Sequence, residues 1–393
     1  MIISIINKGY KYIIIIILYI ILFYYIICKY FKKRKGRHNN YLDIQISKRH
    51  FYIYQCLNHR LINKNIKNFS KPILSVIVPI FNCEKTITST IRSVQNQNIS
   101  EIEIILINDR SNDSSLKIIE DLQKEDPRIV IINNNKNMGT LYSRCIGVLS
   151  TKGKYIFSLD NDDLYYDENL LDYIYKKAKE SDFDIIGFKS FTFPNFNNNL
   201  AEMKENRLSK KPDNLILYQP ELARFPINKD GTLNHIHIWS NCIKQEIYKN
   251  GVNALGLKQY SKFITWAEDI SMIYLLFNIA HSFRFVNKFG VVHFSSKKSA
   301  SSKSLLHERM FGEIFLLNII IDHTKNNEDK NLAVFYALHI KKVNRIKEYK
   351  NENHFLYLKK TLNKILKCKF IKDENKKIIN KKFKNFFLEY NSK

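Results

Sequence analysis

The chain has 393 residues, of which 45% are hydrophobic and 25% charged, as is ordinary for a globular protein, and it is long enough for about two domains. A formal net charge of +26 is typical of a nucleic-acid-binding protein, but 18 of these 26 charges lie in two segments. Residues 29–37 carry +6, and residues 341–393 carry 17 Lys and Arg against 5 Asp and Glu, or +12. Because the first segment follows a long apolar run, we expect an anionic membrane surface, and no nucleic acid, as the partner of these charges.

Residues 12–28 contain no charged side chain and are predicted to form a transmembrane anchor. A run of this length is near the lower limit for a helix that crosses a bilayer. A cleaved signal peptide is the alternative, but no small-residue cleavage site follows the run. Two lysines precede the run and six basic residues follow it, which predicts a single-pass membrane protein with the rest of the chain in the cytosol. The opposite orientation, in the secretory lumen, is the alternative. Residues 29–70 are expected to form a basic juxtamembrane linker.

From residue 71 onward, short apolar runs alternate with amphipathic segments. Strands are predicted at 73–79, 103–107, 128–132, 155–159 and 183–193, and helices at 84–95, 114–123, 139–149 and 168–179. Strands that alternate with helices of about ten residues indicate βαβ units and a parallel sheet. We therefore predict an α/β, Rossmann-like domain with a mostly parallel sheet over residues 71–300. Residues 301–393 are expected to form a basic helical C-terminal region.

Polar side chains follow four of the predicted strands at the point where each strand ends. In chain order they are Asn82 and Glu84, then Asn108, Asp109 and Asp113, then Asn137 and Gly139, then Asp160, Asp162 and Asp163. In open parallel sheets, ligands bind beyond the carboxyl ends of the strands. The sequence therefore predicts that these residues converge at one edge of the sheet.

The last of these groups, Asp160-Asn161-Asp162-Asp163, places three carboxylates in one turn after an apolar strand. So many negative charges repel one another unless a cation lies between them. Carboxylate oxygens at this density suit Mg²⁺ or Mn²⁺, which is often held by one or two carboxylates together with substrate phosphates. A solvated acidic turn is the alternative explanation.

Four segments of this region resemble the motifs of the family 2 glycosyltransferases, which have the GT-A fold. The segments are Ser75–Glu84, Leu106–Asp113, Asn137–Gly147 and Gly153–Asp163. Three later segments resemble the family more loosely. Residues 239–246 resemble the Trp-containing segment of the polysaccharide-type members, residues 266–269 the family's Glu-Asp motif, and residues 291–294 with 299–301 the strand and loop that close the domain. The second segment departs from the family pattern, because Arg110 stands where the family usually has glycine.

The resemblance implies a metal-dependent, inverting glycosyltransferase of the hexosyltransferase type. Such an enzyme moves a sugar from a nucleotide-sugar, here expected to be a UDP-sugar, to a hydroxyl of a glycan, lipid or protein. Donor-binding roles are expected for Pro79, Asn82, Glu84, Asp109, Asn137, Gly139, Arg144 and Asp160. The metal ion, Mg²⁺ or Mn²⁺, is expected at Asp160 and Asp162, with His293 as a further candidate ligand. Arg144 is expected to contact either the diphosphate or the Asp cluster.

The resemblance also names candidates on the acceptor side. Asp269 matches the family's catalytic base, with Glu268 as its rival, although two acids in the first turn of a helix can also serve the helix dipole alone. Trp239 and Trp266 are candidates for stacking on the acceptor sugar, and core packing is the alternative for both. Two other classes of protein stay open: an inactive nucleotide-sugar-binding module, and a basic membrane- or polyanion-interaction protein.

Overall fold

The computed structural model describes one folded region and isolated positions beyond it. The described residues are 52–53, 55–61, 71–193, 204–205, 211–212, 214–226, 234, 237–256, 268–294 and single positions between 312 and 377. In this part of the chain, no helix has both the length and the apolar character needed to span a bilayer. The predicted anchor at 12–28 and most of the predicted linker and C-terminal region lie outside the described residues.

The folded region is built on one sheet with the strand order β3-β2-β1-β4-β9-β6-β10-β5. The strands are β1 Leu74–Ile80, β2 Ile102–Asn108, β3 Ile129–Asn133, β4 Tyr155–Ser158, β5 Leu164–Tyr165, β6 Ile185–Phe193, β7 Lys204–Glu205, β8 Ile216–Tyr218, β9 Asn241–Lys244 and β10 Ser282–Phe294. The helices are α3 Ile87–Gln95, α4 Ser115–Glu125, α5 Thr140–Ser150, α6 Leu170–Lys179, α7 Glu221–Arg224, α8 Gln245–Leu255 and α9 Glu268–Ile279, with a 3₁₀ turn at Ile238–Ser240.

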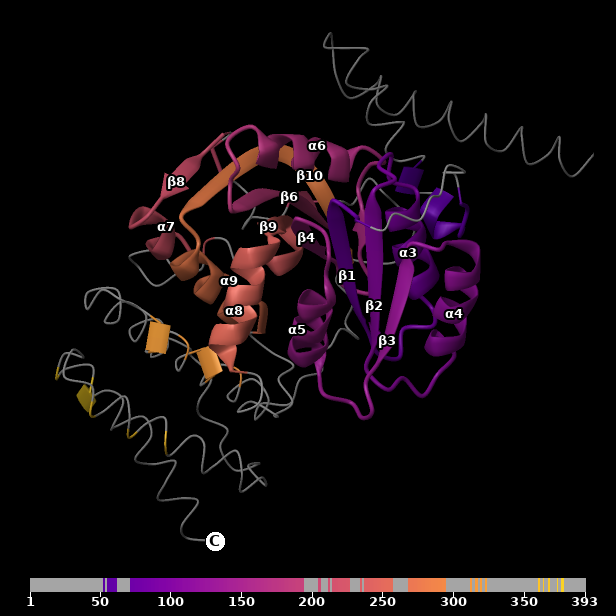
Figure 1. Ribbon diagram of the computed structural model, residues 1–393, viewed down its shortest axis with the longest axis horizontal. Coiled ribbons are helices and arrows are strands. Elements are labelled where there is room, and N and C mark those ends of the chain that lie inside the picture. Colours follow the sequence, from indigo (N-terminus) through magenta and orange to yellow (C-terminus); the bar gives the residue numbers. More distant parts are fainter. Residues whose placement is uncertain are drawn as a thin grey trace, which may run out of the picture. The chain divides into compact units, whose positions relative to one another are not determined.

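The parallel half of the sheet, β3-β2-β1-β4, matches the prediction closely. Every residue of β1 and β2 is buried, as expected for strands covered on both faces. Figure 1 shows α5 on one side of these strands and α3 and α4 on the other. Helix α5 packs tightly: a Cβ on Gly147 would lie 2.7 Å from Cδ1 of Ile107 on β2. The predicted α/β architecture is therefore confirmed in this half, with strand ends shifted by one or two residues.

The second half of the sheet contains antiparallel pairings that the sequence did not predict. Strand β9 lies antiparallel between β4 and β6, and β6 pairs in parallel with β10. The long strand β10 also pairs antiparallel with the short strands β5 and β8. The short strands β5 and β8 have too few residues to show a periodic pattern in the sequence. The position of β9 depends on its pairing with β4 and β6, which are distant in the chain.

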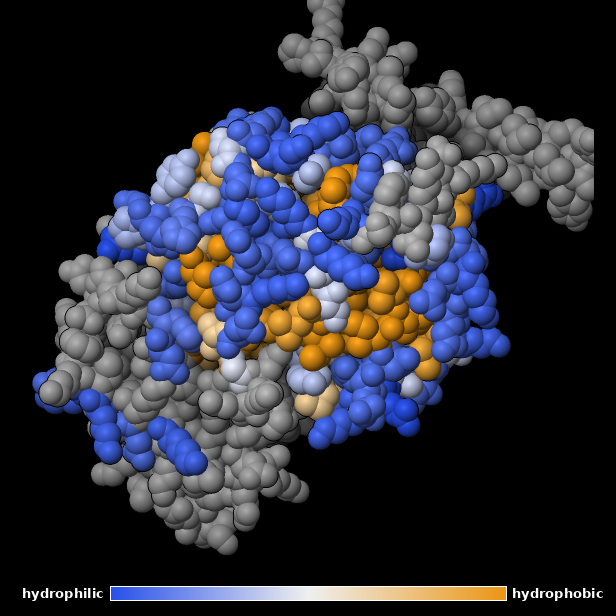
Figure 2. All heavy atoms as spheres, in the orientation of Figure 1, coloured by the Kyte–Doolittle hydropathy of each residue, from blue (hydrophilic) through white to orange (hydrophobic). Residues whose placement is uncertain are grey.

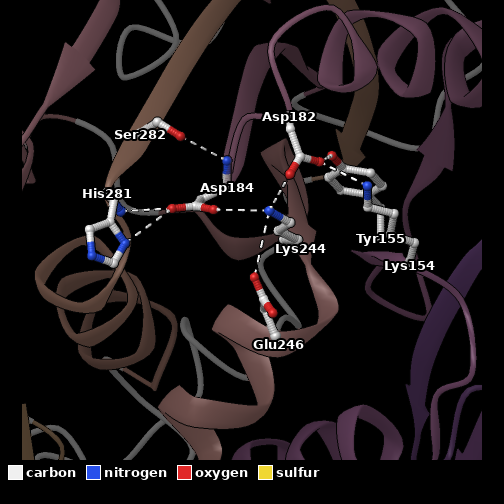
Figure 3. A network of polar contacts seen from close by, with 8 residues as sticks. All are labelled: Lys154, Tyr155, Asp182, Asp184, Lys244, Glu246, His281 and Ser282. Carbon is white, nitrogen blue, oxygen red and sulfur yellow. Dashed lines mark hydrogen bonds and ion pairs between the residues drawn. The ribbon is translucent and has the colours of Figure 1, made fainter.

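A network of charged side chains fastens β9 at the amino ends of its neighbours (Figure 3). Nζ of Lys244, at the end of β9, lies 2.7 Å from Oδ2 of Asp182 and 3.6 Å from Oδ1 of Asp184, both just before β6. Lys154, which precedes β4, also bonds to Asp182 at 2.8 Å. The hydrogen bonds from Lys154 and Lys244 hold the pKa of Asp182 well below its usual range. This network lies at the amino ends of β4 and β6, away from the carboxyl ends described next.

Candidate active site

The carboxyl ends of β1, β2, β3 and β4 lie along one edge of the sheet, because these strands run parallel as neighbours. The polar residues that follow each strand therefore meet there, as the sequence predicted. Their side chains mostly bond to the neighbouring loop, and this pattern of bonds determines the shape of the site.

The loops after β1 and β2 are joined by hydrogen bonds in both directions. Oδ1 of Asn82 accepts the backbone N–H of Asn112 at 2.9 Å. Oε2 of Glu84 accepts the N–H of Ser114 at 3.1 Å, while the N–H of Glu84 donates to Oδ2 of Asp113 at 3.1 Å. The two side chains expected to bind the donor thus hold the loops that would surround it.

Both of these loops contain a residue in the left-handed backbone region. The φ angles are 47° at Asn82 and 61° at Arg110. A left-handed conformation costs a non-glycine residue about 1–2 kcal/mol. This backbone geometry accounts for the glycine that the family usually has at the position of Arg110, whose side chain here is exposed.

Asp109 is buried and holds the loop between β3 and α5. Its Oδ1 accepts the N–H of Met138 at 2.8 Å and Nδ2 of Asn134 at 2.7 Å, and its Oδ2 accepts the N–H of Gly139 at 2.7 Å. Three of the roughly four acceptor positions of this carboxylate are therefore used inside the protein. If Asp109 fills its expected donor-binding role by a contact with the uracil ring, that contact would have to use the remaining acceptor position.

Asn137 and Gly139 complete the turn into α5. Oδ1 of Asn137 also accepts the N–H of Gly139, at 3.2 Å. Gly139 has φ 87° and ψ 164°, a conformation that is essentially restricted to glycine. Asn134 was missed by the sequence analysis, because it lies in an asparagine-rich run without a distinguishing pattern.

The acidic turn after β4 is held against β1 and α3 by Asn161. Its Nδ2 donates to the carbonyl oxygen of Pro79 at 3.1 Å. Pro79, which was predicted to bind the donor, thus contacts the acidic turn. The carbonyl oxygen of Asn161 accepts the hydroxyls of Thr86 at 2.9 Å and Thr90 at 3.0 Å. Asn161, between Asp160 and Asp162, thus anchors the turn, a role that the sequence analysis did not assign.

The three carboxylates of this turn have different surroundings. Asp163 is fully buried, whereas the side chain of Asp160 is 30% exposed. Burial, with the negative charges of Asp163 and Asp160, raises the pKa of Asp162 to about 7. Negative charge is therefore crowded at Asp162, as the metal-site hypothesis expects.

His293, on β10, contacts this turn by hydrogen bonding to Asp163. Its Nδ1 lies 3.0 Å and 3.1 Å from the two carboxylate oxygens of Asp163. The charge of Asp163 raises the pKa of His293 to about 9. Asp163 also accepts the backbone N–H of Phe294 at 3.1 Å, so the carboxylate fixes both the ring and the end of β10.

Trp239 stacks between two imidazole rings. Its ring lies 4.5 Å from that of His237 and 5.4 Å from that of His293, with interplanar angles of 16° and 13°. Trp239 is 3% exposed, as a core residue is. The acceptor contact predicted for Trp239 would require this stack to open. Trp266 lies outside the described residues.

Arg144 joins the acidic turn to the start of α9. Nη2 of Arg144 lies 2.9 Å from Oδ1 of Asp160, and Nη1 lies 2.8 Å from Oδ1 of Asp269. Of the two contacts expected for Arg144, the structure shows the one with the Asp cluster. Burial raises the pKa of Asp269 to about 8, against the opposing effect of Arg144. Burial likewise raises the pKa of Glu268.

Whether this site fits a divalent cation depends on how many protein ligands the ion needs. In the described part of the chain, no three His, Cys, Asp or Glu side chains form a metal-binding group. Asp160, Asp162 and His293 are therefore not assembled as a three-residue ligand set. Mg²⁺ needs only one or two carboxylates when phosphates complete its shell, and the crowded charge at Asp162 fits such an ion.

Part of the chain is similar to known glycosyltransferases. Residues 75–237 match the family model "Glycosyl transferase family 2". The chain is 29% identical over 201 residues to the uncharacterized glycosyltransferase EpsJ of Bacillus subtilis, covering 50% of this chain and 54% of EpsJ. It is 29% identical over 243 residues to the cholesterol galactosyltransferase of Borreliella burgdorferi, covering 60% of this chain and 64% of that protein. The match thus spans about half to two thirds of these relatives' own lengths.

The fold is shared with a solved structure. The crystal structure of residues 1–349 of TarS from S. aureus in complex with UDP-GlcNAc superposes with a TM-score of 0.56. The alignment covers 77% of this chain and 82% of that one at 14% identity. At this identity the likeness establishes the fold, which is the Rossmann-like GT-A arrangement that the sequence predicted.

Proposed function

We propose that this family 2 glycosyltransferase moves a sugar from a UDP-sugar to a hydroxyl acceptor, with inversion at the anomeric carbon. The proposal rests on one observation, that Asp269 and Asp160 pair with the same guanidinium group. These residues lie more than a hundred positions apart, and Arg144 bonds to both. A carboxylate of raised pKa beside an acidic turn at the carboxyl edge of the sheet provides a base next to a donor site.

Asp269 is the proposed general base. In the ionised form, its carboxylate accepts the proton of the acceptor hydroxyl while that oxygen forms a bond to the anomeric carbon. The bond from the anomeric carbon to the diphosphate oxygen breaks on the opposite face, and UDP leaves with the electron pair. A pKa of about 8 gives a stronger base than an ordinary carboxylate, and it leaves part of the population ionised at neutral pH.

Asp160 and Asp162 are the proposed ligands of a Mg²⁺ or Mn²⁺ ion. Such an ion, when bound, supplies positive charge that stabilises the departing diphosphate. His293 is not needed as a third ligand: Asp163 raises its pKa to about 9, so the ring is protonated at neutral pH and supports the turn through its bond to Asp163. Asn161 holds the turn that carries both carboxylates against β1.

The loops after β1, β2 and β3 are proposed to bind the nucleotide. Their mutual hydrogen bonds fix their positions before any ligand arrives, which lowers the entropy lost on binding. The choice of a UDP-sugar is supported by the fold shared with the TarS complex. Among glycan, lipid and protein acceptors, we favour a lipid, because one relative acts on cholesterol and the sequence predicts an anchor.

Transfer and binding assays on a set of nucleotide-sugars test this function. The full-length protein, with Mn²⁺ present, should release UDP from at least one UDP-sugar, and the rate should increase with a lipid acceptor. Binding of UDP-sugar without release of UDP would favour the inactive binding module instead. If only polyanions bind, with affinity that falls steeply with salt, the protein is a basic interaction protein.

A further inference from the structure

Arg144 lies inside the protein between two carboxylates that come from distant parts of the chain. Its side chain is 1% exposed, and its Nη2 and Nη1 atoms bond to Asp160 at 2.9 Å and to Asp269 at 2.8 Å. The first partner belongs to the donor side of the proposed site and the second is the proposed base. The sequence pattern gave no indication of the second contact, because Asp269 follows Arg144 by 125 residues.

We propose that Arg144 is a positioning residue that holds the carboxylate of Asp269 in place to accept the proton of the acceptor hydroxyl. This inference rests on the proposed function, in which Asp269 is the base. Arg144 bonds to a single oxygen of Asp269, Oδ1. A carboxylate has about four acceptor positions, so this bond orients the group and leaves it able to accept a proton.

The shape of the arginine side chain explains why this residue type suits the role. The guanidinium group is planar and rigid, and its two Nη atoms point at two different carboxylates. It therefore fixes the position of Asp269 relative to Asp160. A lysine has one ammonium group on a flexible stem and cannot reproduce both bonds with the same geometry.

Helix α5 gives Arg144 a fixed position from which to act. One turn further along, Gly147 packs against Ile107 so closely that a Cβ would lie 2.7 Å from its Cδ1. The helix therefore cannot move towards the sheet. Asp269, by contrast, is the second residue of α9, and bonds from two other elements hold its carboxylate: one from Nη1 of Arg144 and one from the backbone N–H of Ile238.

A direct contact between Arg144 and the donor diphosphate is the competing role. The structure gives less support to it, because the side chain is buried and both Nη atoms already bond to carboxylates. Arg144 has further N–H donors, including the buried Nε, but a phosphate would have to enter the protein interior to reach them. The two roles predict different effects on nucleotide affinity, so they can be separated by experiment.

The test compares Arg144→Lys with Arg128→Lys in the full-length protein. Arg128 is a matched control, because its side chain is fully buried and forms an ion pair of 2.9 Å with Asp126. This pair lies outside the proposed site. We expect Arg144→Lys to lower kcat about 10²-fold, as a misplaced catalytic group does, and to change the Kd of UDP far less, because the lysine can still pair with Asp160. Arg128→Lys should lower Tm but leave kcat of the folded enzyme unchanged.

A double-mutant cycle shows whether Arg144 acts through Asp269. In an Asp269→Asn background, Arg144→Lys should cost little further activity, because the group that it positions is already lost. Additive losses would overturn the proposal, and so would a Kd for UDP that weakens tenfold or more while kcat is kept. Rescue of kcat by lysine would also contradict it.

Crystal structures of the wild-type protein and of Arg144→Met separate this inference from the proposed function. We expect the carboxylate of Asp269 to turn away in the variant while α9 keeps its position. A carboxylate that stays in place would overturn the positioning role. If the wild-type protein transfers no sugar and yet Asp269 turns in the variant, the proposed function fails and the structural role of Arg144 stands.

Discussion

Oδ2 of Asp109 accepts a hydrogen bond from the backbone N–H of Gly139 at 2.7 Å, although the two residues follow different strands of the sheet. The bond ties the end of β2 to the start of α5. Together with the bonds of Asn82 and Glu84, it makes the loops of the proposed nucleotide site one connected unit. A change in the conformation of any of these loops should therefore alter the positions of the others.

Gly139→Ala tests this connection. The conformation at Gly139, with φ 87° and ψ 164°, is nearly closed to other residues, so alanine should lower the free energy of unfolding by about 1–3 kcal/mol. Because the turn would move away from Asp109, the affinity for UDP should also fall. Denaturant unfolding and calorimetric titration with UDP measure the two effects.

Gly256→Ala is the control for this variant. Gly256 also has a positive φ, 62°, and no atom of the described residues lies within 4 Å of the position that its Cβ would take. We expect a stability loss of about 1–2 kcal/mol from the backbone alone and no change in UDP affinity. Equal losses of UDP affinity in both variants would show that the effect is not specific to the Asp109 loop.

Asp269→Asn should abolish the general base while keeping the size of the side chain. Loss of such a base commonly lowers the rate about 10²–10⁴-fold. The Kd of UDP should stay the same, because Asp269 lies on the acceptor side. If Glu268→Gln is inactive and Asp269→Asn is active, the base is Glu268 and the assignment is wrong.

The pH dependence of the reaction follows from the same residue. Burial raises the pKa of Asp269 to about 8, above the ordinary value of 3.8, and only the ionised carboxylate can accept a proton. The kcat/KM of the free enzyme should therefore rise with pH and level off above about pH 8. This limb of the profile should disappear in Asp269→Asn.

Asp162→Ala should weaken UDP binding in the presence of Mn²⁺ and stop transfer, because the diphosphate loses the ion that balances its charge. Asp121→Ala, at an exposed helix position with an ion pair to Lys124, should change neither. Chelation of the metal with EDTA should have the same effect as Asp162→Ala. Full activity in EDTA would show that basic side chains, and no metal ion, balance the diphosphate.

The parallel strands and the site edge could be predicted because their signals are local. Buried parallel strands such as β1 are continuous apolar runs, and each is followed directly by its polar residues. The antiparallel strand β9 is four residues long, and its place between β4 and β6 depends on pairing with distant segments.

The side-chain partners within the site were less predictable than its location. The bond between Arg144 and Asp269 and the bond between His293 and Asp163 both join residues more than a hundred positions apart. The resemblance suggested which residues matter, but it could not show that Asp109 and Asn82 bind neighbouring loops. Such contacts depend on the packing of the whole sheet.

The membrane anchor and its orientation remain predictions from the sequence. Residues 12–28 should keep the protein in membranes during an alkaline carbonate wash. The basic residues 29–37 should hold the catalytic domain on the cytosolic side. Protease added to sealed vesicles that expose this side should then digest the domain. A protected domain with N-glycans on Asn68 or Asn98, which stand in Asn-x-Ser glycosylation sequons, would place it in the secretory lumen.

The central claim is inverting transfer from a UDP-sugar with Asp269 as base, and the configuration of the first-formed product tests it most directly. The wild-type protein can be followed by proton NMR during turnover of an α-linked UDP-sugar with Mn²⁺. We expect the β-anomer to form first, and Asp269→Asn to form almost none of it in the same time. A first-formed α-anomer, or equal turnover by wild type and Asp269→Asn, would contradict the account.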